Sequence, residues 1–270
     1  MRRSEVFEGI KRVVIKIGTQ VLTSENDRLD ASVIEHIVEQ VCYLVKEKKV
    51  EVILVTSGAI AAGMQVLGWK KRPRGLHKLQ AAASIGQSRL MRVYERLFKE
   101  EGLNVGQILL TRDVFTSPER KKIARATIST LLRLGVIPVI NENDSIAVEE
   151  IKFGDNDTLS ALVTELLTAD MLLMVTDVEG LSRGGDPKKN ADSRLIKDVR
   201  DFNKISGIEI GESSGKGMGG MKSKITAARQ VVENGKFCMI LNGKKMWSLK
   251  KAFKGSGVGT LFSPEKTRGN

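Results

Sequence analysis

Short, nearly continuous apolar runs alternate with longer helix-like segments along almost the whole of this chain. The runs are five or six residues long and lack a regular polar alternation, which is typical of strands buried on both faces. Such strands form parallel sheets covered by helices, so we predict an α/β fold: a three-layer α/β/α sandwich with a mostly parallel central sheet. The expected strands cover residues 13–17, 52–56, 105–110, 136–140, 171–176 and 237–241, and the expected helices cover residues 31–48, 60–67, 78–101, 119–134, 158–168 and 222–234.

The length of 270 residues suits one large α/β domain or two small ones. The strand–helix pattern is interrupted over residues 178–221, which are rich in glycine and polar residues. We interpret this segment as a long excursion that carries a functional loop, and not as a second core. We therefore expect residues 1–270 to form a single domain.

The chain is basic, with 44 lysines and arginines against 32 aspartates and glutamates and a formal net charge of +12. Such a charge favours anionic partners, which include nucleotides, nucleic acids and acidic metabolites. Aromatic residues make up only 4% of the sequence and offer little material for stacking bases, so we expect no nucleic-acid partner. A solvated lysine-rich surface, as in heat-adapted proteins, is the simpler explanation of the charge.

Neither a membrane span nor an export signal is evident in the sequence. No apolar run approaches the roughly 20 residues that cross a bilayer, and the basic N-terminus leads into no apolar core. We therefore expect a cytoplasmic protein without a membrane partner. Cys42 and Cys238 lie in apolar segments and are expected to be buried thiols, and with only His36 and His77 a zinc site is not expected.

Polar side chains are concentrated at two points between residues 138 and 158. The apolar run that ends at Ile140 is followed by four polar residues, 141–144, and the polar segment 154–157 precedes a helix-like stretch. Parallel sheets bind ligands at the carboxyl ends of their strands, so these groups predict a site for a small polar ligand. Turn chemistry is the alternative, because Asn, Asp and Gly dominate loops and Asp155 alone would serve as a helix N-cap.

Two further strand ends carry groups suited to a ligand. Lys16 lies inside the first apolar run, where a cation is costly to bury unless it is paired or reaches a ligand; a lysine that extends to water is the alternative. The second run leads into Ser57 and Gly58 at a helix start, where free N–H groups attract carboxylate or phosphate. Close packing by small residues also explains this turn, and both explanations can hold together.

A glycine-rich loop precedes the last long helix. Residues 215–220 formally satisfy the G-x-G-x-x-G pattern, but no strand comes directly before them and no Gly-Lys-Ser/Thr triplet closes a P-loop. What remains is a loop that delivers Lys222 and Lys224 to a helix start, where lysines can surround phosphates. With Thr176 and Asp177 at another strand end, these features predict a small-molecule kinase without a P-loop.

The same motifs resemble the amino-acid kinase family, in order and over nearly the whole chain. So many ordered matches are not expected by chance, and the resemblance is closest to members that phosphorylate glutamate. The matching segments are residues 16–19, 55–63, 86–89, 107–111, 138–144, 154–161, 176–177, 219–224 and 257–262.

The resemblance implies ATP-dependent phosphorylation of the γ-carboxylate of L-glutamate, the first step of proline synthesis, with Mg²⁺ held largely by ATP oxygens and water. Lys16 and Lys224 would flank the transferring phosphoryl group, and Asp157 would hold both lysines in place. The N-terminal part would bind mainly the acceptor, and the part from about residue 170 mainly the nucleotide. Glutamate would be bound by Ser57, Gly58, Asn141, Asp144 and Asn156, and ATP by Lys16, Thr176, Asp177, Met218, Gly219, Gly220, Met221, Lys222, Ser223 and Lys224.

The resemblance also implies inhibition by proline, functional coupling to glutamyl phosphate reductase and a homo-oligomer. Two departures leave points open. Many bacterial relatives carry a C-terminal PUA domain, which we do not expect in a chain that ends at Asn270, and Ser182 stands where the family often has a tyrosine near the nucleotide. The alternatives are another kinase of this fold, acting on N-acetylglutamate, aspartate, carbamate or uridylate, and a nucleic-acid-binding regulatory protein.

Overall fold

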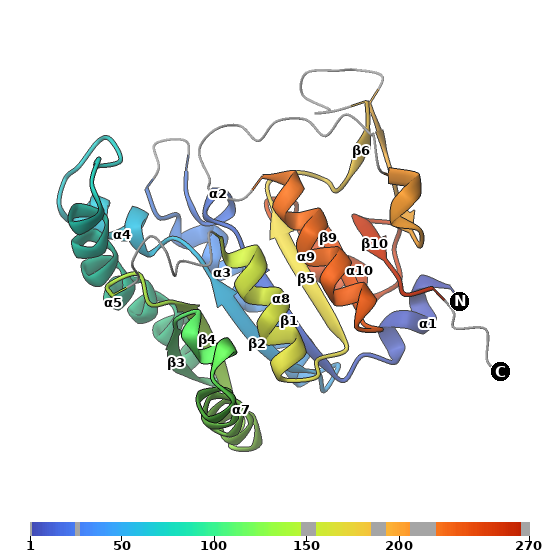
Figure 1. The fold of residues 1–270 in the computed structure, drawn as a ribbon, viewed down its shortest axis with the longest axis horizontal. Helices are drawn as coiled ribbons and strands as arrows, with labels where there is room; N and C mark the ends of the chain where they lie inside the picture. The colour runs from blue at the N-terminus through green and yellow to red at the C-terminus, as the bar shows by residue number, and fades with distance from the viewer. Residues whose placement is uncertain (1, 25–27, 147–154, 185–192, 206–219, 266–270) are drawn as a thin grey trace.

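The computed structural model describes residues 2–24, 28–146, 155–184, 193–205 and 220–265. Over these residues an eight-stranded sheet lies between two layers of helices, and the predicted three-layer α/β/α fold is confirmed (Figure 1). The strand order is β3-β4-β2-β1-β5-β9-β10-β8, and only the β9–β10 pair is antiparallel. The strands are β1 (Arg12–Ile17), β2 (Glu51–Thr56), β3 (Asn104–Leu110), β4 (Val136–Glu142), β5 (Met171–Thr176), β8 (Asp198–Val199), β9 (Phe237–Asn242) and β10 (Thr260–Phe262).

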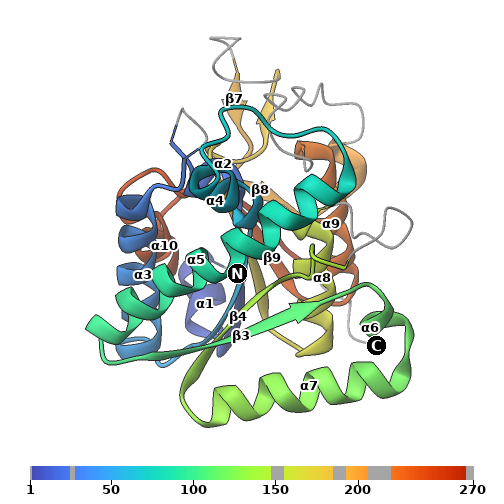
Figure 2. The same ribbon diagram turned by 90° about the vertical axis from the view of Figure 1, so that its left-hand side faces the viewer.

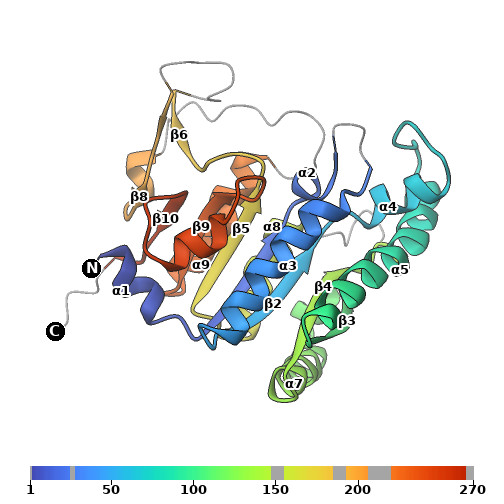
Figure 3. The same cartoon turned by 180° about the vertical axis from the view of Figure 1, so that it is seen from behind.

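Each face of the sheet has its own apolar core. Helices α8 (Asn156–Leu166) and α9 (Met221–Glu233) cover the face that is toward the viewer in Figure 1. Helices α3 (Ala31–Lys46) and α5 (Leu76–Glu100) cover the opposite face (Figure 3). The other described elements are α1 (Arg3–Glu8), α2 (Thr19–Leu22), α4 (Ala59–Val66), α6 (Asp113–Thr116), α7 (Pro118–Arg133), η2 (Phe202–Ile205), α10 (Ser248–Phe253) and a small hairpin of β6 (Ser182–Arg183) and β7 (Arg194–Leu195).

Every strand and helix predicted from the sequence is present, but three interpretations need correction. Strand β4 continues to Glu142, so Asn141 and Glu142 belong to the strand and do not follow it. Strand β3 is a half-exposed edge strand beside α7, and the prediction of burial on both faces is wrong there (Figure 2). In the excursion 178–221, Val199 and Ile205 pack into one of the two cores, so part of this segment is structural.

The chain path leaves a ligand-binding position at the carboxyl end of β1. From β1 the chain passes to β2 on one side, builds β3 and β4 beyond it, and then returns to β5 on the other side of β1. The connections at β1 therefore diverge, which is the point of an open α/β sheet where ligands bind. Residues at the ends of β1, β2, β4 and β5 meet at this edge.

Two glycines allow α4 and α5 to pack with their backbones almost in contact. A Cβ atom on Gly63 would lie 1.8 Å from the carbonyl oxygen of Ala82, and one on Gly86 would lie 1.7 Å from that of Ala59. Helix α4 starts two residues after Ser57, with Gly58 as its N-cap, so this contact also fixes the strand-end turn predicted to bind a ligand. The small-residue segment that leads into α4 is therefore a packing element as well as a candidate site. Its close packing is against helix α5 and not only against the sheet.

Replacement of Gly86 by alanine is expected to destabilise the protein by about 1–3 kcal/mol or more, because the opposing atoms are backbone and cannot rotate away. The midpoint of thermal unfolding measures this effect. Gly9→Ala is the matched control, since a Cβ atom there would have only ordinary contacts, the nearest at 3.5 Å. Equal unfolding temperatures for the two variants would contradict the close packing of α4 on α5.

Candidate functional site

Lys16 points toward the layer formed by α8 and α9. Side chains alternate along a strand, so Lys16 shares a face of β1 with Val14, which belongs to the core beneath these two helices. Lys16 lies one residue before the end of β1 and is 6% exposed. A lysine so deeply buried requires a partner, and the two helices supply one.

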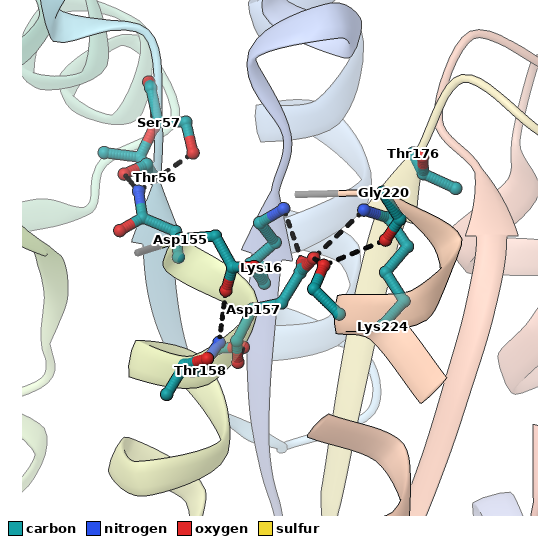
Figure 4. A network of polar contacts seen from close by, with 12 residues as sticks. Lys16, Thr56, Ser57, Asp155, Asp157, Thr158, Thr176, Gly220 and Lys224 are labelled. Atoms are coloured by element: carbon teal, nitrogen blue, oxygen red, sulfur yellow. Dashed lines mark hydrogen bonds and ion pairs between the residues drawn. The ribbon is translucent and has the colours of Figure 1, made fainter. Parts of the chain in front are cut away.

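Asp157 lies between two lysines that come from different elements (Figure 4). Its carboxylate is 2.6 Å from Lys16 Nζ through Oδ1 and 3.0 Å from Lys224 Nζ through Oδ2. The hydroxyl of Ser223 also donates to Oδ2, at 2.7 Å. Asp157 lies in the first turn of α8, where an anion is favourable, but Lys224 lies near the start of α9, where the helix dipole disfavours a cation. A cation held at an unfavourable position indicates a functional group.

The electrostatics of this cluster depend on burial and on the two opposite charges. Burial by itself would raise the pKa of Asp157, but Lys16 and Lys224 outweigh it and lower the pKa to about 2. Burial lowers the pKa of Lys16 below its ordinary value; attraction to Asp157 opposes this shift and repulsion from Lys224 adds to it. Two ammonium groups against one carboxylate leave a net charge of +1, which suits an anionic ligand.

A second polar group surrounds the end of β2. The side-chain nitrogen of Asn156 donates to the carbonyl oxygen of Thr56 at 2.8 Å, to Ser57 Oγ at 2.9 Å and to Asn141 Oδ1 at 3.0 Å. Gly58 follows as the N-cap of α4, with a φ of 98° that favours glycine. Asn156 is adjacent to Asp157 in α8, so the two polar groups are neighbours. The turn explanation of Asp155 also holds, because it caps α8 by accepting from Thr158 N–H at 2.9 Å.

The remaining predicted site residues are spread around this centre. Thr176 ends β5, and it lies on the opposite side of Lys16 from Ser57, with Asp177 directly after it (Figure 4). Asp144 is half-buried just beyond β4. Gly220 is the N-cap of α9, followed by half-buried Met221 and by Lys222, which is exposed where Lys224 is buried. Met218 and Gly219 lie outside the described residues.

Gln87 is a site neighbour to which the sequence assigned no role. Its side-chain oxygen accepts from Asn141 Nδ2 at 2.9 Å, although Gln87 lies on α5, on the far side of the sheet from α8. Gln87 lies in the matching segment 86–89, directly after Gly86, where α5 packs closely on α4. In the parts of the chain that the structure describes, no three His, Cys, Asp or Glu side chains are grouped to hold a metal, and no helix is long and apolar enough to span a membrane.

Solved structures of known proteins share this fold. Carbamate kinase from Giardia lamblia bound to AMP-PNP superposes with a TM-score of 0.68 at 17% sequence identity, covering 96% of this chain and 100% of that one. UMP kinase from Bacillus anthracis gives a TM-score of 0.66 at 18% identity, covering 95% and 97% of the two chains. At these identities the likeness establishes the fold alone.

Sequence relatives are much closer. A glutamate 5-kinase of Geobacter sp. (strain M21) is 46% identical over 266 residues, which are 97% of this chain and 70% of the relative. A glutamate 5-kinase of Pseudomonas putida (strain ATCC 700007) is 44% identical over 265 residues, which are 98% of this chain and 70% of that protein. The sequence profile of the amino acid kinase family matches residues 11–242, a span that includes both polar groups. This chain belongs to the amino acid kinase family.

Proposed function

We propose that the protein is a glutamate 5-kinase, which transfers the γ-phosphoryl group of ATP to the γ-carboxylate of L-glutamate and forms γ-glutamyl phosphate and ADP. Its similarity to glutamate 5-kinases, 44–47% over nearly the whole chain, supports the acceptor and the reaction. The observation that carries the mechanism is the carboxylate of Asp157 held between the ammonium groups of Lys16 and Lys224.

In this proposal the two lysines act on charge and position. An oxygen of the acceptor carboxylate attacks the γ-phosphorus, and the bond from phosphorus to the oxygen bridging to ADP breaks. The acceptor is already ionised at neutral pH, so no proton must be removed and no general base is needed. Asp157, with its pKa of about 2, is correspondingly a poor base. Lys16 and Lys224 neutralise the charge that spreads over the transferring oxygens.

The two substrates would approach from opposite sides of Lys16. Ser57 lies on one side of Lys16, and Thr176 and the start of α9 lie on the other (Figure 4). Asn156 belongs with Ser57, to which it donates a hydrogen bond, and Asp177 directly follows Thr176. We assign glutamate to the first group, with Asn141, Gly58 and Asp144, and the nucleotide to the second, with residues 218–224. This division agrees with an acceptor half and a nucleotide half that meet near residue 170.

Mg²⁺ fits this site as a partner of the nucleotide. The most central carboxylate, Asp157, is occupied by two lysines and a hydroxyl group, so it is not available as a metal ligand. Phosphate oxygens and water are the ligands that Mg²⁺ prefers in nucleotide sites, and we propose that ATP brings the ion with it. There the ion would add positive charge at the phosphates.

A panel of acceptors tests the proposed function. Purified protein with Mg²⁺ and ATP is expected to release ADP with L-glutamate and not with N-acetylglutamate, aspartate, carbamate or uridylate. Addition of proline is expected to reduce the rate, because we also propose feedback inhibition. Turnover with a different acceptor would keep the kinase chemistry and contradict the substrate. Absence of ADP release with every acceptor, from folded protein that binds ATP, would contradict the enzyme.

Three further proposals rest on the resemblance to glutamate 5-kinases alone. We propose that the protein acts in the cytoplasm, that it forms a homo-oligomer, and that its product passes to glutamyl phosphate reductase. The chemistry of an acyl phosphate supports the last of these, because such a reactive product must be consumed promptly.

The pH dependence of kcat should reflect the lowered pKa of the buried Lys16 side chain. Because burial lowers its pKa below the ordinary 10.5, Lys16 loses its proton at a lower pH than an exposed lysine. We therefore expect kcat to fall on the alkaline side below pH 10.5. Asp155 favours the charged form of Lys16, and Asp155→Asn, which preserves the N-cap, should move this fall to lower pH. If the alkaline fall of kcat occurs at the same pH in Asp155→Asn and in the wild type, deprotonation of Lys16 is not its cause.

A further inference from the structure

A chain of three side-chain amides crosses the sheet and ends at the proposed acceptor site. Gln87 on α5 accepts from Asn141 on β4, at 2.9 Å, and Asn141 accepts from Asn156 on α8, at 3.0 Å. Asn156 then donates to Ser57 Oγ at 2.9 Å. The chain thus connects a helix of one layer with the first turn of a helix of the other.

The orientation of each amide is fixed by backbone groups at two points. The N–H group of Glu142 can only donate, and it donates to Asn141 at 2.9 Å, so the atom of Asn141 that faces it is the oxygen. The carbonyl group of Thr56 can only accept, so Asn156 presents its nitrogen there. With Asn141 so placed, its nitrogen faces Gln87, and Gln87 must present oxygen.

In this orientation the side-chain nitrogen of Gln87 makes no hydrogen bond to a described residue. Gln87 is 8% exposed, and its buried Nε2 has no hydrogen-bond partner among the described residues. A turned amide would bring its NH₂ group against the NH₂ group of Asn141, which is worse than one unpaired nitrogen. The oxygen of Gln87 is therefore the part of the side chain that the site uses.

The fixed amides decide what the acceptor site offers to a ligand. Ser57 Oγ accepts from Asn156 and donates to no described residue, so its hydroxyl hydrogen is available to a carboxylate. The two hydrogens of the Asn156 nitrogen are shared among three acceptors, and its oxygen accepts from no described residue and is available to an ammonium group. One donor and one acceptor match the two charged groups on the α-carbon of an amino acid.

We propose that Gln87 is a positioning residue that completes the hydrogen-bond chain behind the acceptor site and so holds Asn141, and through it Asn156, in place. This inference rests on the proposed function, because it assigns the acceptor to Ser57 and Asn156. Gln87 itself does not touch the substrate. Its loss leaves the buried NH₂ group of Asn141 without this acceptor, which loosens the Asn141 side chain whose oxygen receives a hydrogen bond from Asn156.

The test compares two replacements of similar size. Gln87→Met has no acceptor and is expected to raise the KM for glutamate about tenfold, as for one lost buried hydrogen bond, while kcat and the KM for ATP stay within about threefold. Gln87→Glu keeps an acceptor oxygen and should restore the glutamate KM to within about threefold of the wild type. Ser88→Ala, on the exposed neighbour, is the control.

Three kinetic outcomes would overturn the inference. They are an unchanged glutamate KM in Gln87→Met, an equal rise in Gln87→Met and Gln87→Glu, and a parallel change in the KM for ATP. Thermal unfolding of each variant shows whether the fold is retained.

A second measurement is independent of turnover. NMR of the unliganded protein should show slow hydrogen exchange of the Asn156 side-chain amide in the wild type and in Gln87→Glu, and fast exchange in Gln87→Met. A wild-type protein without glutamate turnover would contradict the proposed function, and the exchange rates would still decide the role of Gln87. Equal exchange of Asn156 in wild type and Gln87→Met would overturn it.

Discussion

Replacement of Lys224 by alanine is expected to lower kcat by about 10²–10³, which corresponds to the loss of about 3–4 kcal/mol of transition-state stabilisation. The ammonium group is buried, lies 3.0 Å from Asp157 and contributes one of the two cations at the centre of the site. Its charge matters most when charge spreads over the transferring phosphoryl oxygens, so the KM for glutamate should change little. Steady-state kinetics with glutamate and ATP varied separately measure both quantities.

Two control variants show whether the loss of kcat depends on the position of the charge at residue 224. Lys251→Ala removes a cation from an exposed site on α10 and is expected to leave kcat within about twofold, because an exposed charge is screened by solvent. Lys224→Arg retains the charge but not the compact ammonium group, and should fall between the alanine variant and the wild type. A kcat for Lys224→Ala equal to that of Lys251→Ala would remove Lys224 from the chemistry.

Replacement of Asp157 by asparagine should damage both activity and stability. The carboxylate is fully buried and pairs with two buried lysines, so its loss leaves two ammonium groups without a counter-charge. Removal of one partner from a buried ion pair costs about 3–5 kcal/mol, and we expect a loss of unfolding free energy of this order. Because both lysines lose their anchor, kcat should also fall by about 10² or more. At a pH below the alkaline fall of kcat, Asp155→Asn is the matched control, since it makes the same chemical change two residues away and preserves the N-cap.

The acid side of the stability curve gives a second test of Asp157. Its pKa is lowered in the folded state to about 2 from an ordinary 3.8, so its contribution to stability is complete above pH 3.8. This contribution is lost as pH falls through about 2, when the folded protein must also protonate the carboxylate. The free energy of unfolding, measured by chemical denaturation, should therefore fall more steeply with decreasing pH between these values in the wild type than in Asp157→Asn. Identical pH dependence in the two proteins would contradict the buried ion pairs.

The sheet and its main helices were predictable because their pattern is local. Each strand from β1 to β9 that the sequence predicted is a run of apolar residues of the right length, and the helices between them show their apolar faces. Helices of four to six residues and strands of two or three residues, such as α6, α10 and β8, were not predicted because such short segments carry too little pattern. The burial of strand β3 was predicted wrongly because the sequence of an edge strand can be as apolar as that of a central one.

The sequence supplied a set of candidate site residues but not their arrangement. Alternation along β1 predicts that Lys16 faces the same layer as Val14, but the sequence does not show which helices form that layer. Asp157 and Lys224 come from two helices far apart in the chain, and their contact depends on the packing of α8 beside α9. The contact of Gln87 was hidden for the same reason, since its bond to Asn141 joins a helix and a strand that are far apart in the chain.

The central claim is that the phosphoryl group passes to the γ-carboxylate of glutamate at the Lys16–Asp157–Lys224 cluster. Trapping with hydroxylamine tests it most directly, because an acyl phosphate reacts to form a hydroxamate whose position mass spectrometry can locate. We predict γ-glutamyl hydroxamate that requires ATP and glutamate and that is reduced at least about a hundredfold in Lys224→Ala. ADP release without any hydroxamate, or an undiminished yield in Lys224→Ala, would contradict this account.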